Sequence, residues 1–436
     1  MPARIASRHL DVFLDGGRIG DLQQDSRGAL RFAYDEDYRR SPDSTPLSLS
    51  MPLTRLSHAP RQTRAFFDGL LPDSEAVRQR WASQYGASAT NPFSLLVHVG
   101  RDAAGAVQVL SPGTASTDAD EPTGDIEWLT DSDLATMTRD LAQHRGDWDP
   151  GRQGGRWSLS GAQPKVALYR DPDSGRWGIP QDSTPTTHII KPMLEGLDGH
   201  DLNETLCLRA AREVGISAAR VDLLDLADTR AVVSTRFDRR IVKGRIVRLH
   251  QEDLCQALSV SPTQKYQSDG GPGVGEIADL FATLPVESRI MSCEAFFRAL
   301  AFNVLIGGTD AHAKNYSVGL RRDRVQLTPL YDVASAAPYP THQRLVSAMK
   351  VGSTWTMLDV TSRDWASVSR RFRLPEDVGV AWVDQLVQDL PVAFATAITG
   401  LPADVRQCGE QLVEPIIDHV EGRWRPPLDR NPGRVL

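Results

Sequence analysis

The chain has 436 residues, of which 40% are hydrophobic and 24% charged, and its formal net charge is −7. This composition is typical of a soluble globular protein, and the length predicts two or three domains because one hydrophobic core rarely grows so large. The acidic balance argues against free-standing nucleic-acid binding through a broad basic field. No apolar run is long enough to span a membrane, and the N-terminus has no signal-peptide pattern. The four cysteines are far apart and lack the spacing of metal ligands. We therefore expect a cytoplasmic protein.

The first 110 residues predict a small β-rich domain. Residues 10–14 and 18–22 flank an Asp-Gly-Gly turn and predict a hairpin, 29–34 predicts a third strand, and a helical pattern lies within 64–85. We find no catalytic constellation in this domain, so a structural or partner-binding role is expected. Residues 111–124, rich in Pro, Gly, Ser, Thr and acidic residues, predict a linker.

The remaining chain predicts a mixed β region followed by a helical region. One helix over 204–214, capped by Asn203 and stopped at Gly215, is expected among the strands. Pro391 is expected to start a new helix or to kink the one before it. The expected strands are 166–169, 177–179, 188–191, 221–226 and 231–237, and the later helices are 252–258, 275–284, 292–306, 376–390, 391–398 and 403–422. The fold class is therefore α+β, with a small β-rich lobe (116–245) and a larger helical lobe (246–436) after the N-terminal domain (1–115).

Two stretches carry the polar residues of greatest interest. LIGGTDAHAKNYS, residues 305–317, holds Asp310 and Asn315, and LTPLYDVAS, residues 327–335, holds Asp332. One Asp near a substrate hydroxyl, with an Asn and a second Asp around magnesium, is the polar equipment of a protein-kinase-like phosphoryl transferase. The spacing alone is weak support, because Asp and Asn more often serve turns and caps.

Lys191 ends an apolar strand, and Glu204 lies in the first turn of the next helix. In a kinase small lobe such a lysine pairs with nucleotide phosphates and a helix glutamate. The alternatives are a lysine that snorkels to solvent and a glutamate that complements the helix dipole. In the polar stretch, His312 is expected to brace the loop by hydrogen bonding, and Lys314 could neutralise a transferring phosphoryl group.

Three further segments are candidates for nucleotide contacts. The small-residue loop 158–163 could lay backbone N–H groups against phosphates, or could be an ordinary tight connection. The glycine-rich 270–275 suits a cap or a mobile surface loop better than a nucleotide site. Backbone groups in 232–238 could meet an adenine edge, with Phe237 alternatively only a core residue.

Together these motifs resemble the HipA family, the serine/threonine kinase toxins of bacterial toxin–antitoxin modules. The resemblance extends to the N-terminal domain through FDGLLPD (67–73). The other matching stretches are SLSGAQPK (158–165), TPTTHIIK (184–191), NE (203–204), RFDRR (236–240), QEDLCQ (251–256), KYQSDGGPG (265–273) and the two polar stretches above.

The resemblance implies a two-lobed, phosphatidylinositol-kinase-like fold that uses ATP and Mg²⁺. It makes Asp310 the catalytic base, Asn315 and Asp332 the magnesium ligands, and Lys191 the contact to the α/β phosphates. It implies autophosphorylation of a serine in the phosphate loop, where Ser158 is the matching residue and Ser160 is a second candidate. The further ATP-site residues implied are Leu159, Ser160, Gly161, Ala162, Gln163 and Lys165 in the phosphate loop, Thr235, Arg236 and Phe237 in the hinge, and Glu204, His312 and Lys314.

The resemblance also implies partners. The family phosphorylates aminoacyl-tRNA synthetases, and a HipB-like helix-turn-helix antitoxin binds the kinase and carries the DNA contacts; no membrane partner is implied. Two other functions stay open. One is a co-repressor scaffold that binds an antitoxin with little catalysis, against which the intact polar set argues, and the other is a small-molecule kinase.

Overall fold

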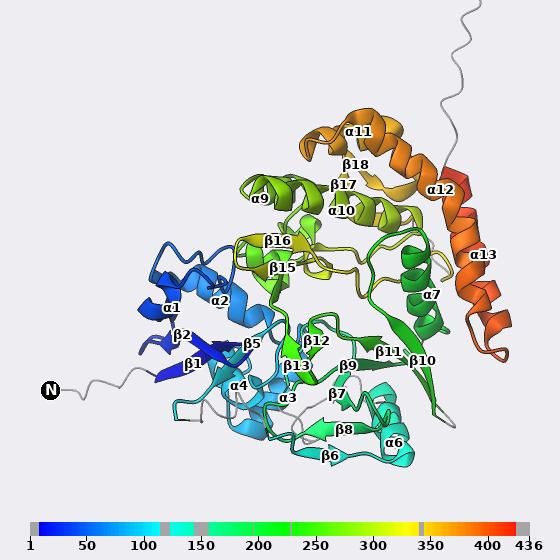
Figure 1. Cartoon of the computed structure of the whole chain (residues 1–436). Helices are drawn as coiled ribbons and strands as arrows, with labels where there is room; N and C mark the ends of the chain where they lie inside the picture. Colours follow the sequence, from blue (N-terminus) through cyan, green and yellow to red (C-terminus); the bar gives the residue numbers. More distant parts are fainter. Residues whose placement is uncertain are drawn as a thin grey trace, which may run out of the picture.

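The computed structural model describes residues 8–113, 123–143, 157–194, 196–226, 229–339 and 344–423. Figure 1 shows the N-terminal part in blue, the central sheet in cyan and green, and the helices of the C-terminal part in yellow-green to red. The expected linker therefore lies largely outside the described residues. Within them, no helix has the length and apolar character needed to cross a membrane.

The N-terminal unit is an antiparallel sheet with the strand order β4-β3-β2-β1-β5, covered by helices. The expected hairpin is confirmed, because Asp15 and Gly16 both adopt positive φ, which gives the turn that matches strand twist. The elements are β1 (Arg8–Leu14), β2 (Gly17–Gln24), β3 (Leu30–Tyr34), α1 (Glu36–Arg40), β4 (Ser57–His58), α2 (Pro60–Gly69), α3 (Glu75–Tyr85), α4 (Pro92–Val99) and β5 (Val107–Leu110).

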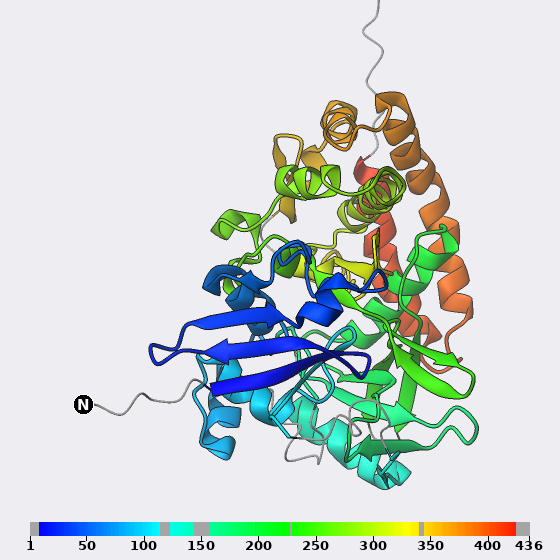
Figure 2. The ribbon, with the colours of Figure 1, turned by 60° about the vertical axis from the view of Figure 1, so that its left-hand side comes forward.

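The small lobe is a six-stranded antiparallel sheet with the order β10-β11-β9-β7-β8-β6. Its inner residues Val166 and Ile190 share one hydrophobic core with Val12 and Phe67 of the N-terminal unit. The two parts therefore pack as one body, as the 60° rotated view in Figure 2 also shows. The elements are β6 (Ile126–Trp128), α6 (Asp131–Gln143), β7 (Val166–Arg170), β8 (Trp177–Pro180), β9 (His188–Pro192), α7 (His200–Glu213), β10 (Val221–Leu226) and β11 (Thr229–Thr235).

The rest of the described chain is mainly helical, and it also contains two two-stranded sheets and one three-stranded sheet of short strands. The strands are β12 (Arg239–Val242), β13 (Arg245–Arg248), β14 (Gln251–Asp253), β15 (Ser317–Arg321), β16 (Arg324–Leu327), β17 (Val346–Val351) and β18 (Thr354–Thr356). The α-helices are α8 (Leu254–Ala257), α9 (Val274–Ala282), α10 (Val286–Leu305), α11 (Ser362–Arg371), α12 (Glu376–Thr399) and α13 (Arg406–Arg423), and the 3-10 helices are η1 (Pro262–Gln264), η2 (Gln267–Asp269), η3 (Ala313–Asn315) and η4 (Met357–Asp359). The α+β class is confirmed.

The cap predicted at Asn203 was wrong, and of the two alternatives for Pro391 the new helix was wrong, while the kink stays a prediction. Asn203 does not cap α7, because that helix already begins at His200, and the buried Asn203 side chain bonds the backbone of Ser335 in both directions. α12 continues through Pro391 without restarting. Leu390 and Phe394 beside it are buried, so tertiary packing compensates for the hydrogen bond that proline cannot donate.

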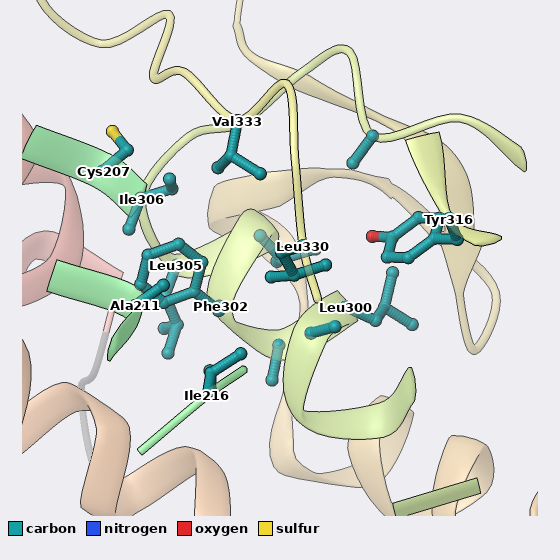
Figure 3. Close-up of a cluster of buried hydrophobic side chains, with 14 of the residues drawn as sticks. Cys207, Ala211, Ile216, Leu300, Phe302, Leu305, Ile306, Tyr316, Leu330 and Val333 are labelled. Atoms are coloured by element: carbon teal, nitrogen blue, oxygen red, sulfur yellow. The ribbon is translucent and has the colours of Figure 1, made fainter. Parts of the chain in front are cut away.

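The core of the large lobe supports the polar stretch from behind. Figure 3 shows Phe302, Leu305 and Ile306, from the end of α10, beside Leu330 and Val333. These last two residues closely flank Asp332 in the chain. Both polar stretches are thus anchored in one apolar cluster, and a rigid support of this kind fixes the polar side chains that follow.

Candidate active site

A cavity of about 810 Å³ lies between the two lobes and the N-terminal unit. This volume is in the range of sites for nucleotide-sized ligands. Every site residue that the sequence predicted lines it, with the exception of Ser158. The predicted residues that it brings together are Leu159, Ser160, Gly161, Ala162, Gln163, Lys165, Lys191, Glu204, Thr235, Arg236, Phe237, Asp310, His312, Lys314, Asn315 and Asp332.

Lys191, near the end of β9, has two carboxylate partners. Its Nζ lies 2.6 Å from Glu204 Oε1 on α7 and 2.7 Å from Asp332 Oδ1. The predicted Lys191–Glu204 pair is therefore confirmed. Burial alone would lower the pKa of Lys191, but the two carboxylates outweigh it and raise the pKa, so this ammonium stays charged.

Asp332 has a strained backbone conformation. Its φ is +57°, a left-handed conformation that non-glycine residues seldom adopt and that clusters at functional sites. Burial would raise the pKa of its carboxyl, but Lys191 and Lys165 outweigh this and hold the pKa well below its usual range. The preceding Tyr331 donates its hydroxyl to the Lys314 carbonyl at 2.8 Å, which ties the two polar stretches together.

The other polar stretch turns sharply out of α10. Asp310 follows this turn, and its side chain is 63% exposed and directed to the cavity. Asn315 donates Nδ2 to the Asp310 carbonyl at 2.8 Å, so its Oδ1 is the atom that can ligate a cation. The carboxylate of Asp332 and this amide oxygen fit Mg²⁺, which prefers oxygen donors and keeps several positions for water and phosphate.

The His312 side chain does not make the loop-bracing hydrogen bond that the sequence predicted, because its Nδ1 is buried without a partner among the described residues and its Nε2 lies 3.7 Å from Asp310 Oδ1. The His312 backbone N–H donates to the Asp310 carbonyl at 2.8 Å, and burial lowers the pKa of its imidazole to about 4, so the ring is neutral near pH 7. Tyr266 packs edge-on against this ring with centroids 4.8 Å apart. The Tyr266 hydroxyl also donates to Asp310 Oδ1, a contact that the sequence did not indicate.

The loop at 158–165 is folded into the cavity wall. The Ser158 side chain is fully buried and donates its hydroxyl to the Leu70 carbonyl at 2.8 Å. Lys165 donates to the Ser160 carbonyl at 2.8 Å. Burial lowers the pKa of Lys165 to about 8; the nearby charge of Lys191 also lowers this pKa, and the charge of Asp332 opposes the shift. Gly161 has φ +104°, and an added Cβ would meet Lys165 Nζ at 2.5 Å, so the turn requires glycine.

The predicted hinge lies just after β11, which ends at Thr235. The Arg236 guanidinium is buried and pairs with Asp238 at 2.8 Å and with Asp102 at 3.2 Å. This side chain is therefore engaged inside the protein, and the backbone is the part of Arg236 that can face a ligand. Phe237 is half-buried and lies 5.7 Å, centroid to centroid, from the ring of Tyr331.

Sequence reasoning missed Asp73. This residue follows α2 of the N-terminal unit, lines the cavity, and lies 2.7 Å from Lys314 Nζ and 2.9 Å from Lys265 Nζ. Burial would raise the pKa of Asp73, but the two lysines hold it well below the usual range. Its only signal in the sequence was its place in FDGLLPD, a motif that carries no evident chemistry by itself.

Two family models match most of the chain. A model of the HipA N-terminal domain matches residues 10–110, and a model of the HipA-like C-terminal domain matches 157–394. The chain is 33% identical over 399 residues to "Putative kinase Y4mE" of Sinorhizobium fredii, covering 91% of this chain and 92% of that protein. It is 27% identical over 407 residues to the serine/threonine-protein kinase toxin HipA of Shewanella oneidensis, covering 90% of each.

Among solved structures, the chain is similar to one in the complex of Shewanella oneidensis HipA, HipB and their operator DNA. The TM-score is 0.80 at 24% identity, over 94% of this chain and 96% of that chain. At this identity the likeness establishes the fold.

Proposed function

The chain belongs to the HipA family, and on this premise we propose that it is an ATP-dependent serine/threonine protein kinase that acts as the toxin of a HipBA-like module. The observation that carries the proposal is the buried Lys191, bonded to Glu204 and Asp332 in a cavity that Asp310 and Asn315 also line. This arrangement supplies a phosphate-binding cation, a metal-binding pair and a carboxylate base in one place.

In the proposed reaction, Asp310 accepts the proton of the acceptor hydroxyl, because its carboxylate is exposed to the cavity. Lys191, fixed by Glu204, binds the α/β phosphates of ATP. Asn315 and Asp332 would hold Mg²⁺, and the ion would supply positive charge to the phosphates of ATP. Lys314 adds positive charge on the same side of the cavity, and backbone groups at 235–237 meet the adenine.

Autophosphorylation is proposed at Ser158, with Ser160 as the second candidate. The Ser158 hydroxyl is buried against the Leu70 carbonyl, so the loop must leave this position before the hydroxyl can accept phosphate. A phosphoserine could not return to this position, because its charged group would be buried against the Leu70 carbonyl oxygen. Phosphorylation would therefore keep the loop out of the cavity wall.

We further propose a cytoplasmic protein with three units, residues 1–115, 116–245 and 246–436. The proposed partner is a HipB-like helix-turn-helix antitoxin, with DNA reached only through it; the similar Shewanella chain comes from a complex of HipA, HipB and operator DNA. The proposed substrate is an aminoacyl-tRNA synthetase.

The proposal is tested by incubating the purified chain with Mg-ATP and a panel of aminoacyl-tRNA synthetases, followed by phosphopeptide mapping. Wild type should place phosphate on a synthetase and on Ser158 or Ser160, and Asp310→Asn should not. Asp377→Asn, which removes an exposed carboxylate at the start of α12, is the matched control and should behave as wild type. ATP turnover without any phosphoprotein would favour a small-molecule kinase, and no turnover with tight antitoxin binding would favour the scaffold.

A further inference from the structure

The N-terminal unit reaches the candidate active site through residues 70–73, which connect α2 to α3. The Leu70 carbonyl accepts the Ser158 hydroxyl at 2.8 Å, and the Asp73 N–H donates to the Gly161 carbonyl at 3.0 Å. Pro72 and Gly161 also form a parallel bridge. The backbone of this segment is therefore fixed against the phosphate loop, which gives the Asp73 side chain a defined position.

The Asp73 carboxylate joins two lysines that come from different parts of the large lobe. Oδ1 lies 2.7 Å from Lys314 Nζ and Oδ2 lies 2.9 Å from Lys265 Nζ. The side chains of Asp73, Lys314 and Lys265 are only 11%, 3% and 17% exposed. Ion pairs this far removed from water fix geometry much better than surface pairs, and removal of one partner leaves the others uncompensated.

Each lysine is next to a residue with a proposed chemical role. Lys314 precedes Asn315, the proposed metal ligand. Lys265 precedes Tyr266, whose hydroxyl donates to the Asp310 carboxylate. Asp73 thus acts on both through its lysine partners: it pairs with Lys314, the chain neighbour of Asn315, and with Lys265, the chain neighbour of the tyrosine that contacts Asp310.

We propose that Asp73 is a positioning residue of phosphoryl transfer, through which the N-terminal unit sets the placement of Lys314 and of the Lys265–Tyr266 segment in the active site. This inference rests on the proposed kinase function. Another carboxylate that acts on Lys314 is Asp253, but its Oδ1 accepts the Gln256 N–H at 2.9 Å as the cap of α8. Removal of the Asp73 charge is therefore expected to leave Lys314 without the carboxylate partner that lies 2.7 Å from its Nζ.

The test measures the maximal rate of autophosphorylation and the ATP concentration that gives half of that rate, with Mg-ATP and the full chain. Asp73→Asn keeps the shape of the side chain and removes its charge, so the maximal rate should fall about 10–100-fold, as expected for loss of charge-assisted hydrogen bonds. The half-saturating ATP concentration should change less than about threefold, because Lys191 and the phosphate loop remain. Asp73→Glu, which restores the charge, should recover part of the rate.

The control is Asp11→Asn, which removes a carboxylate of the same unit that is 17% exposed, is ion-paired with Arg18 and does not line the cavity. Its rate should equal that of wild type, and the folded fraction of each variant is measured by denaturation at the assay temperature. A rate for Asp73→Asn within about twofold of wild type, or a loss matched by an equal fall in folded fraction, overturns the inference. A wild-type chain that transfers no phosphate instead refutes the kinase proposal itself, so the two failures are distinguishable.

A double-mutant cycle with Lys265→Met gives a second, independent readout. If Asp73 acts by holding Lys265, the rate loss of the double variant should be clearly smaller than the product of the two single losses. Losses that multiply would show that the two residues act separately, which contradicts the proposed positioning.

Discussion

Replacement of Lys191 by Met tests the centre of the site through stability as well as activity. The Met side chain keeps most of the aliphatic volume and removes the ammonium that lies 2.6 Å from Glu204 and 2.7 Å from Asp332. The Glu204 side chain is 2% exposed, so it would be left as a buried carboxylate without its cation partner. The loss of its cation partner should cost less at Asp332, because this side chain is 31% exposed and the charge of Lys165 still acts on it.

The expected loss of stability follows from these environments. Breaking a buried ion pair by removing one partner costs about 3–5 kcal/mol. Because Asp332 keeps a second cation, we expect a value near the lower end, about 3 kcal/mol, in the free energy of unfolding. Phosphate transfer should fall at least about 100-fold, because the phosphate-binding charge is lost.

Urea denaturation followed by circular dichroism, together with a rate of transfer from labelled ATP, measures both effects. Lys350→Met is the matched control, since this lysine is exposed and its Nζ lies over the ring of Trp355, 5.4 Å from the centroid. Its stability should change by less than about 1 kcal/mol and its activity should be unaffected. Equal stability losses in the two variants would refute the reasoning about the buried pair.

Two further predictions concern the contacts of the N-terminal unit. Burial raises the pKa of Glu252 from 4.5 to about 8, while its Oε1 accepts the Leu49 N–H at 2.7 Å. Since the folded chain then holds a proton that the unfolded chain has lost, stability should fall as pH rises from about 6 to about 8.5, by roughly 2–3 kcal/mol more than in Glu252→Gln. Urea midpoints at both pH values check this, and parallel trends in the two proteins would contradict it. Ser158→Ala removes the donor to the buried Leu70 carbonyl and should cost about 1–2 kcal/mol in the free energy of unfolding. Ser160→Ala should cost less than about 0.5 kcal/mol, because the contact of Ser160 with Lys165 uses its backbone carbonyl. A larger loss of stability in Ser160→Ala than in Ser158→Ala, measured by denaturation, would be inconsistent with the loop position.

Sequence reasoning located the polar residues well because each belongs to a short motif whose order along the chain carries information. Lys191, Asp332 and the pair Asp310 and Asn315 come from three separate segments, and the structure brings all four residues to one cavity. The Lys191–Glu204 pair could be anticipated because Lys191 lies near the end of one strand and Glu204 lies in the helix that follows, although α7 begins at His200 and Glu204 is therefore not in its first turn as expected. Local pattern and chain order were sufficient for these residues.

The contacts that the sequence did not predict share a different cause. Asp73 and Lys314 are 241 positions apart, and no local pattern in an N-terminal loop shows that its carboxylate meets a lysine of the large lobe. Asn203 matched a helix cap locally, but its side chain bonds Ser335 across the lobe. The burial of the Arg236 guanidinium against Asp102, a residue of the N-terminal unit, was likewise not predicted, although Arg236 lines the cavity as expected. In each case a long-range contact decided the outcome.

The central claim is that Asp310 serves as the base in transfer of the ATP γ-phosphate to a protein hydroxyl. The most direct measurement is the first-order rate of phosphate incorporation from γ-labelled Mg-ATP into the purified wild-type and Asp310→Asn chains. We predict incorporation in wild type and a loss of about a thousandfold or more in Asp310→Asn, with the folded fraction unchanged. Equal incorporation in the two chains would contradict the account.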